Sequence, residues 1–174
     1  MIVCAGDIEQ FTFAKSIGIG LVNVAMNLTE LCLKENPKSL IFVGTAGSYG
    51  EKNIFDIIES TVAVNIENSF FSNSSYTPLN SKVESLENVS RETLVNSSNY
   101  ITTDKTLGKH YLNQNIHLEN MEFFAVMKVA QKFNIPVKGI FIVTNYCDEN
   151  AHNSFMENRK EAMCRLSVYV KSRV

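Results

Sequence analysis

The chain reads SLIFV from Ser39 to Val43 and continues as GTAGS from Gly44 to Ser48, and this stretch decides the fold class. The apolar run has the length of a strand and is typical of one that is covered on both faces of a sheet. The small residues after it predict a loop at its carboxyl end. A helical pattern over about 21–35 precedes the run, and a short apolar run at 2–5 precedes that helix. Strand, helix and strand in this order predict an α/β fold.

The rest of the chain continues the alternation of strands and helices. Further strands are expected at 11–15, 54–58, 61–66 and 137–144. A short helix is expected to end at His110, with Thr102 or Thr103 as its N-terminal cap. Two longer helices are expected over about 120–133 and over about 150–172. Residues 68–98 are rich in Asn and Ser and predict an irregular excursion with one or two short strands. No repeat or domain boundary interrupts the pattern, so we expect 1–174 to form a single domain.

Composition narrows the classes of function. The chain has 174 residues, of which 45% are hydrophobic and 20% charged, with a net charge of -2. This balance argues against disorder and offers no electrostatic footprint for nucleic acid or an anionic membrane. No apolar run approaches the roughly 20 residues of a membrane span, and the N-terminus has no basic region, so a cytoplasmic location is expected. Four scattered cysteines without a C-x-x-C pair predict neither disulfides nor a zinc site, and no metal is expected.

Three polar groups follow predicted strands or open a predicted helix, where α/β sheets commonly bind ligands. The first, Gly44–Gly47, can offer backbone N–H groups to ligand oxygens, or can simply be a tight turn. The second, Glu119–Glu122, can place a carboxylate on a vicinal diol, or can favour a helix N-terminus through the helix dipole. In the third, Asn145 offers a donor and an acceptor that match the N7/O6 edge of a 6-oxopurine, or it can close a turn.

Together with Gly18-Ile19-Gly20 before the first helix, these groups resemble, in this order, the purine nucleoside phosphorylase and nucleosidase superfamily. The resemblance is widest over Ser16–Ala46 and over Asn120–His152. The chain is shorter than other members, and the missing stretch lies between the first strand and Phe11–Gly20. The resemblance implies a single domain of three layers, with a central mixed sheet flanked by helices.

The resemblance also implies roles for individual residues. Met121 would support the ribose, Glu122 would bind its 2′ and 3′ hydroxyls, and His152 would approach its 5′ side. Asn145 stands where nucleosidases carry an acidic residue that protonates N7. The residues implied at the junction of base and phosphate or water are Thr45, Ala46 and Gly47. The residues implied for binding phosphate are Gly18, Gly20 and Thr45. Glu9 would match the glutamate that activates water in nucleosidases.

The expected reaction is that of a purine nucleoside phosphorylase, a pentosyltransferase that cleaves a 6-oxopurine nucleoside with inorganic phosphate to give free base and ribose 1-phosphate. Inorganic phosphate would be the co-substrate, without a cofactor, and the chain would form a homo-oligomer in purine salvage. No arginine lies beside Gly44–Gly47 in the sequence, which leaves phosphate to backbone N–H groups, Lys15, Thr45 or a neighbouring subunit. The alternatives are a hydrolytic nucleosidase that uses water and Glu9, and a non-catalytic nucleoside-binding relative.

Overall fold

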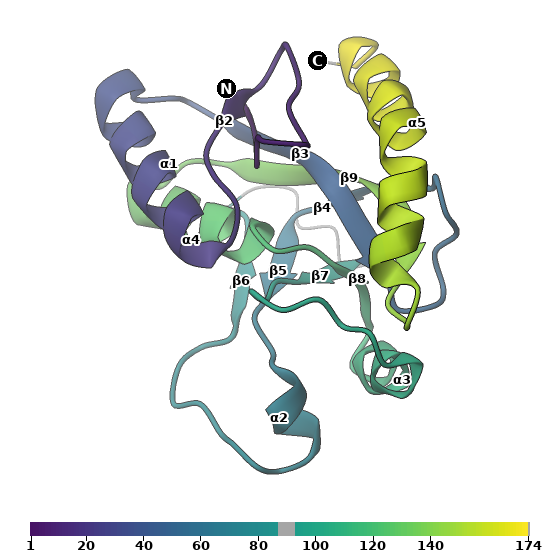
Figure 1. The fold of residues 1–174 in the computed structure, drawn as a ribbon. Coiled ribbons are helices and arrows are strands. Elements are labelled where there is room, and N and C mark those ends of the chain that lie inside the picture. The colour runs from purple at the N-terminus through teal and green to yellow at the C-terminus, as the bar shows by residue number, and fades with distance from the viewer. Residues whose placement is uncertain (87–92, 174) are drawn as a thin grey trace.

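The computed structural model describes residues 1–86 and 93–173 of the chain. It contains a mixed β-sheet with helices on both faces, as the sequence predicts (Figure 1). The strands are β1 (Ile2–Cys4), β2 (Lys15–Ser16), β3 (Leu40–Ser48), β4 (Ile57–Ser60), β5 (Val62–Val64), β6 (Lys82–Glu84), β7 (Leu94–Asn96), β8 (Ile116–Glu119) and β9 (Val137–Tyr146). The helices are α1 (Leu21–Glu35), α2 (Asn68–Phe71), α3 (Lys105–Asn113), α4 (Phe123–Phe133) and α5 (Ala151–Lys171).

Strand β3 is the centre of the sheet, because β9 pairs with it in parallel along its whole length. The predicted loop at Gly44–Ser48 is therefore wrong, since these residues continue the strand. Small residues are compatible with a turn, but here the neighbouring strands supply partners for their backbone groups. The extension carries Thr45, Ala46 and Gly47 into the interior of the sheet rather than onto a loop.

The other edge of β3 is shared by two different partners. Strand β1 pairs with it in parallel at Ile41 and Phe42, and β8 pairs with it antiparallel at Gly47 and Ser48. Strand β2 extends the sheet from β1, whereas β7, β5 and β6 extend it from β8. Thr45 lies between the two partners, at a fork in the sheet. The N–H and C=O groups of Thr45 that face this edge are therefore free to form hydrogen bonds with side chains.

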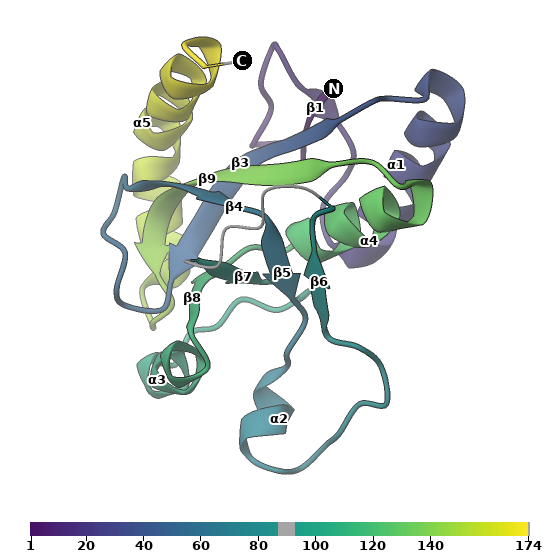
Figure 2. The same cartoon turned by 180° about the vertical axis from the view of Figure 1, so that it is seen from behind.

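The helices cover the two faces of the sheet. Alternate side chains of a strand point to opposite faces, and β9 follows this rule. Phe141 and Val143 join the core beneath α1 and α4, while Ile140 and Ile142 join the core beneath α5. Figures 1 and 2 show α1 and α4 on the side of the molecule opposite α5. Among the described residues, no helix has both the length and the apolar content needed to cross a bilayer.

Several predicted boundaries differ from the structure. The expected strand at 11–15 is wrong apart from its last residue, because Phe11 instead inserts into the core beneath α5. The predicted cap of α3 is also wrong: Asp104 caps this helix by accepting a hydrogen bond from the Thr106 N–H. Thr102 instead binds Glu119. The sequence did not reveal β8.

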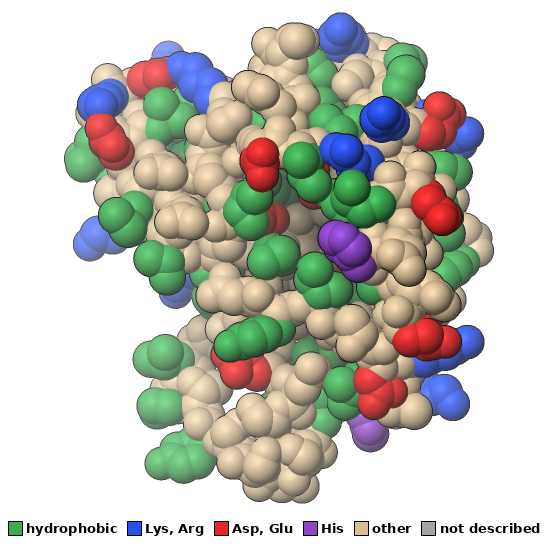
Figure 3. Space-filling view, in the orientation of Figure 1, with side chains coloured by type: hydrophobic (Ala, Val, Ile, Leu, Met, Phe, Trp, Pro, Cys, Tyr) green, Lys and Arg blue, Asp and Glu red, His purple; other side chains and the backbone are tan. Residues whose placement is uncertain are grey.

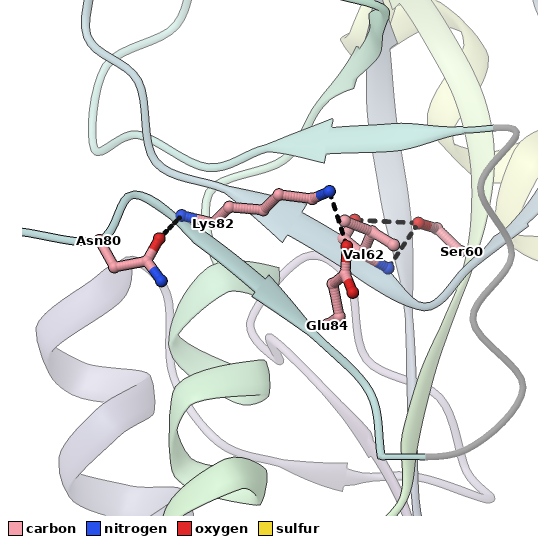
Figure 4. A network of polar contacts seen from close by, with 5 residues as sticks. All are labelled: Ser60, Val62, Asn80, Lys82 and Glu84. Atoms are coloured by element: carbon pink, nitrogen blue, oxygen red, sulfur yellow. Dashed lines mark hydrogen bonds and ion pairs between the residues drawn. The ribbon is translucent and has the colours of Figure 1, made fainter.

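The segment 68–98 contains α2, β6 and β7, and its residues 87–92 lie outside the described part of the chain. Strand β6 pairs antiparallel with β5 at the outer end of the sheet, where local polar contacts accompany the two strands (Figure 4). The Ser60 hydroxyl accepts a hydrogen bond from the Val62 N–H at 3.2 Å, and Asn80 accepts one from the Lys82 N–H at 3.0 Å. Lys82 also forms an ion pair with Glu84 at 2.6 Å. These contacts lie at an edge of the sheet away from the fork in β3.

Candidate active site

A cavity of about 250 Å³ opens at the fork in β3. It lies between the loop after β1, the end of β3, the segment that joins β8 to α4, and the start of α5. Figure 3 shows it as a hollow near the middle of the face, with hydrophobic side chains around it and acidic side chains inside. The predicted site residues that line it are Glu9, Thr45, Ala46, Gly47, Met121, Glu122, Asn145 and His152.

Thr45 holds the carboxylate of Glu9 in this cavity. Its backbone N–H donates a hydrogen bond to Glu9 Oε2 at 2.9 Å, and its hydroxyl donates one to Oε1 at 2.8 Å. The Thr45 carbonyl accepts a hydrogen bond from Asn120 Nδ2 at 3.1 Å. The fork makes this possible, because neither β1 nor β8 uses these backbone groups. Burial raises the pKa of Glu9, and the two hydrogen bonds from Thr45 oppose that rise.

Glu122 brings a second carboxylate into the cavity. It is the N-cap residue of α4, but its side chain does not cap the helix. The side chain of Asn120 accepts hydrogen bonds from the N–H groups of Glu122 and Phe123 at the start of the helix, both at 2.9 Å. The Glu122 carboxylate instead accepts a hydrogen bond at 3.0 Å from the Gly20 N–H at the start of α1. Burial raises the pKa of Glu122 to about 7, the Gly20 N–H opposes this, and the charge of Glu9 adds to it.

Glu119 also lines the cavity, but its carboxylate is already engaged. It accepts hydrogen bonds from the Tyr49 hydroxyl at 2.9 Å, from the Thr102 N–H at 2.8 Å and from the Thr102 hydroxyl. Burial raises its pKa, and these donors oppose the rise. The sequence left open whether Glu119 or Glu122 binds a diol. Glu119 accepts three hydrogen bonds and Glu122 accepts one, so Glu122 has more capacity to accept hydrogen bonds from a ligand.

A bulge in the pairing of β3 with β9 brings Asn145 to the cavity. Ala46 pairs with Val143 but Gly47 pairs with Asn145, so the register shifts by one residue there. The amide of Asn145 accepts from the Thr144 hydroxyl at 2.9 Å and donates to the Tyr146 carbonyl at 3.1 Å. Because an amide has two N–H groups and an oxygen with two lone pairs, one donor and one acceptor remain.

Gly47 leaves the space that the Asn145 amide occupies. A Cβ atom at position 47 would lie 3.0 Å from Asn145 Nδ2 and 2.9 Å from Cys147 Sγ. These separations are shorter than ordinary van der Waals contacts. The glycine at the last position of Gly-Thr-Ala-Gly thus has a structural reason, which is the close approach of the Asn145 and Cys147 side chains.

The predicted phosphate ligands do not come together as a group. Gly18 and Gly20 do not line the cavity, and the Gly20 N–H is bound to Glu122. Lys15 forms an ion pair with Glu35 on the surface. Only Thr45 of this set lines the cavity, and both of its donors bind Glu9. Within the described residues, neither Arg nor Lys lines the cavity, and no group of His, Cys, Asp and Glu side chains is placed to hold a metal ion.

Sequence reasoning missed the apolar part of the lining. Ile8, Ile19, Ile101 and Phe155 all face the cavity. Phe155 follows His152 by three residues on α5, and this spacing was the available signal, since such residues share a helix face. The other three are single apolar residues in loops, which no periodic pattern singles out. Together they make the mouth of the cavity hydrophobic around its acidic floor.

The sequence model of the phosphorylase superfamily matches residues 85–173, which is about half of the chain. The chain belongs to the phosphorylase superfamily. This confirms the resemblance that the motifs suggested. The matched residues include the segment between β8 and α4, the end of β9 and all of α5, so they supply most of one side of the cavity. No curated protein matches the chain.

Solved structures of several nucleosidases and of a futalosine hydrolase share the fold. A Helicobacter pylori 5′-methylthioadenosine/S-adenosylhomocysteine nucleosidase mutant with 5′-methylthioadenosine in its active site is 19% identical, with a TM-score of 0.81 over 98% of this chain and 95% of that one. A Helicobacter pylori futalosine hydrolase mutant is 18% identical, with a TM-score of 0.82 over 98% and 96%. A Streptococcus pneumoniae nucleosidase with 8-aminoadenine is 18% identical, with a TM-score of 0.76 over 97% and 95%. They confirm the predicted fold.

These comparisons correct the predicted reaction. The expectation of a purine nucleoside phosphorylase, and with it of a transferase of the pentosyltransferase class, is wrong, because the similar structures are nucleosidases and a futalosine hydrolase. They favour the hydrolytic alternative. The site gives a physical reason, since the donors of Thr45 that phosphate would need hold a carboxylate. The carboxylates of Glu9 and Glu122 would also repel a phosphate anion in this small cavity.

Proposed function

We propose that the chain is a purine nucleosidase, which cleaves the N-glycosidic bond of a 6-oxopurine nucleoside with water. The observation that carries this proposal is the position of Glu9. Thr45 holds its carboxylate in the same cavity as Glu122, with no cation in the described lining to bind phosphate instead. A carboxylate held in this way can take a proton from water. The fold shared with nucleosidases supports the same reaction.

Glu122 binds the sugar in this proposal. Its carboxylate accepts hydrogen bonds from the 2′ and 3′ hydroxyls of the ribose, and Met121 packs against the ring. As the bond to the base breaks, the ribose gains the character of an oxocarbenium cation. The negative charge of Glu122 stabilises this cation, and such preorganised groups typically lower a barrier by about 3–4 kcal/mol. The Gly20 N–H keeps one carboxylate oxygen fixed during this step.

Glu9 activates the water. The water oxygen forms a bond to C1′ while one of its protons moves to the Glu9 carboxylate. The bond between C1′ and N9 breaks, and its electron pair leaves with the base. Thr45 orients the carboxylate, and Ala46 and Gly47 line the junction between the water and the base. The products are free base and ribose.

Asn145 recognises the leaving base. The base takes up a proton from solvent at N7, and the remaining acceptor of the amide binds this N7–H. The remaining donor of the amide binds O6 of a 6-oxopurine. Asn145 cannot itself give up a proton, so it acts by hydrogen bonding rather than as a general acid. A 6-aminopurine would present an N–H donor to the donor of the amide, which disfavours it.

His152 lies at the rim of the cavity, on the 5′ side of the ribose in this arrangement. All 174 residues act as a single nucleoside-cleaving domain in the proposal. Assembly into a homo-oligomer stays a prediction from the sequence.

The decisive experiment measures release of hypoxanthine from inosine in phosphate-free buffer. We expect release without phosphate, no gain when phosphate is added, and oxygen-18 from labelled water in the ribose. Glu9→Gln should lower kcat by a factor of about 100 or more, because it removes the base. Glu59→Gln is the matched control, because Glu59 pairs with Lys138 outside the cavity. Strict dependence on phosphate would contradict the proposal. Tight binding of inosine without any release would indicate the non-catalytic relative.

A further inference from the structure

The segment that follows β7, residues 97–104, runs beside the segment that follows β8 and carries Glu122. Strands β7 and β8 are parallel, so their carboxyl ends lie at the same edge of the sheet. The Asn120 N–H donates to the Asn96 carbonyl at 2.9 Å and joins the two segments. Ile101 of the first segment lines the cavity. The residues after β7 therefore lie next to the part of the site that binds the sugar in the proposed function.

This segment contacts the first turns of two helices. The Ser97 hydroxyl accepts a hydrogen bond at 3.0 Å from the N–H of Phe124, in the first turn of α4. The Asn99 side-chain oxygen accepts one, also at 3.0 Å, from the N–H of Leu21, the first residue of α1. The N-cap of α1 is Gly20, which has no side chain, so Asn99 supplies the acceptor from 78 positions away. One short segment thus holds the starts of both helices.

The hydrogen bond to Asn99 is adjacent to the one that holds Glu122. The Gly20 N–H donates to Glu122 Oε1 at 3.0 Å, and the N–H of the next residue, Leu21, donates to Asn99 at the same distance. The Asn99 amide also lies against Gly20, since a Cβ atom at position 20 would be 3.0 Å from Asn99 Oδ1. Gly20 has a φ of 80°, in the region that favours glycine. Because glycine is the most permissive residue, the direction of its N–H depends on such contacts.

We infer that Asn99 is a positioning residue for the Glu122 carboxylate, and this inference rests on the proposed function. Asn99 is exposed and does not line the cavity, so it acts through Leu21 and Gly20 rather than on the substrate. By holding the start of α1 it keeps the Gly20 N–H directed at one oxygen of Glu122. The other oxygen then meets the 2′ and 3′ hydroxyls of the ribose in a constant direction.

The same contact acts on the ionisation of Glu122. The Gly20 N–H lowers the pKa of this carboxyl, whereas burial and the charge of Glu9 raise it. If Asn99 no longer holds the start of α1, the hydrogen bond from Gly20 weakens and the pKa of Glu122 rises further. Removal of the Asn99 side chain should therefore change both the recognition of the ribose hydroxyls and the titration of Glu122.

Two nucleosides that differ only at the 2′ hydroxyl test the effect on recognition. These are inosine and 2′-deoxyinosine, measured in phosphate-free buffer. In Asn99→Ala we expect kcat/KM for inosine to fall about tenfold and the preference for inosine over 2′-deoxyinosine to fall about three- to tenfold, because the 2′ hydroxyl loses a well-placed acceptor. A merely structural loss would slow both nucleosides equally. Asn99→Asp keeps the side-chain oxygen and should restore most of the preference.

Asn80→Ala is the matched control, because the Asn80 side chain also accepts a backbone N–H at 3.0 Å but lies beside β6, away from the cavity. It should leave the preference unchanged. A preference that survives Asn99→Ala, or one that falls equally in Asn80→Ala, would overturn the inference while the nucleosidase stands.

A measurement without substrate separates this inference from the proposed function. The contribution of the Glu122 proton to the free energy of unfolding is lost as the pH rises through the pKa of Glu122 in the folded state. In Asn99→Ala this pKa is higher, so urea unfolding should show the loss extending to higher pH than in the wild type or in Asn80→Ala. Adding Glu122→Gln to Asn99→Ala should abolish this difference. If the wild type cleaves neither nucleoside, the nucleosidase proposal fails. The unfolding profiles then decide the inference, which a shift confined to Asn99→Ala supports and equal profiles overturn.

Discussion

The Glu9 carboxylate accepts a hydrogen bond from the backbone N–H of Thr45 at 2.9 Å and another from its hydroxyl at 2.8 Å. This pairing depends on the sheet, because β3 changes its partner from β1 to β8 around Thr45 and leaves that N–H free. The position of the proposed base is thus set by the central strand rather than by the loop that carries it. Without these two hydrogen bonds the carboxylate would not be held where it can orient a water for attack on C1′.

Replacing Thr45 with Val removes the hydroxyl but keeps the shape of the side chain. We expect kcat for inosine to fall about tenfold or more, since a hydrogen bond to a charged group is lost at the base. The pKa of Glu9 should rise, because a contact that lowers it is gone, so the activity should reach its plateau at a higher pH. The pH profile of kcat measures both effects. Thr45→Ser keeps the hydroxyl and is the control, and equal profiles for the two variants would contradict the proposed role of Thr45.

The raised pKa of Glu122 predicts how stability depends on pH. In the folded chain this pKa is about 7, whereas the ordinary value is 4.5. Between pH 4.5 and 7 the folded state binds the Glu122 proton more tightly than the unfolded state does. The contribution of this proton to the free energy of unfolding is therefore complete below about pH 4.5 and is lost as the pH rises through 7. The loss is roughly 3 kcal/mol, because each unit of pKa shift corresponds to about 1.4 kcal/mol. Urea unfolding from pH 4.5 to 8 should show it for the wild type.

Glu122→Gln removes the titrating group and keeps an acceptor for the Gly20 N–H. The variant should therefore gain stability relative to the wild type as the pH increases. Glu149→Gln changes an exposed carboxylate near the cavity and should follow the wild type. A constant difference between Glu122→Gln and the wild type across this pH range would show that burial does not perturb Glu122 as the structure implies.

Short-range patterns predicted the parts of the site that lie within one segment. Met121, Glu122 and Asn145 follow or precede elements whose periodicity is clear, and the structure puts all three on one cavity. Contacts between distant segments could not be predicted in this way. The hydrogen bond from Gly20 to Glu122 joins residues 102 positions apart, and it depends on the packing of α1 against α4. No local pattern carries that information.

The extension of β3 illustrates the same limit. Small residues at Gly44–Ser48 favour a turn by their own preferences, but tertiary pairing with β9 and β8 overrides them. The strand β8 was missed for a related reason, because its four residues IHLE, Ile116–Glu119, alternate too briefly to be recognised. Phosphorolysis was predicted from the resemblance, in which Asn145 replaces the acidic residue of nucleosidases and Gly18, Gly20 and Thr45 are assigned to phosphate. The Gly18 N–H instead donates to the Ala5 carbonyl, and the Gly20 N–H donates to Glu122.

Gly47 offers a test of how Asn145 is positioned. In Gly47→Ala the new Cβ would crowd both Cys147 Sγ and the Asn145 amide, so we expect a loss of about 1–3 kcal/mol in stability from overpacking. Adding Cys147→Ala makes room on one side and should restore part of the stability. It should not restore cleavage of inosine, because the Asn145 amide stays displaced. Thermal unfolding and kcat/KM of the single and double variants check this, and full recovery of activity in the double variant would contradict it.

Asn145→Asp tests which base the site recognises. The carboxyl group can give a proton to N7 but has no N–H donor for O6, and it can accept a hydrogen bond from the 6-amino group of adenine. We therefore expect kcat/KM for inosine to fall about tenfold or more and the ratio of adenosine to inosine cleavage to rise by at least that factor, which competition between the two nucleosides measures. Asn145→Ala removes donor and acceptor together, so it should slow both substrates with little change in their ratio. A ratio that is the same in Asn145→Asp and Asn145→Ala would mean that base selection resides elsewhere in the cavity.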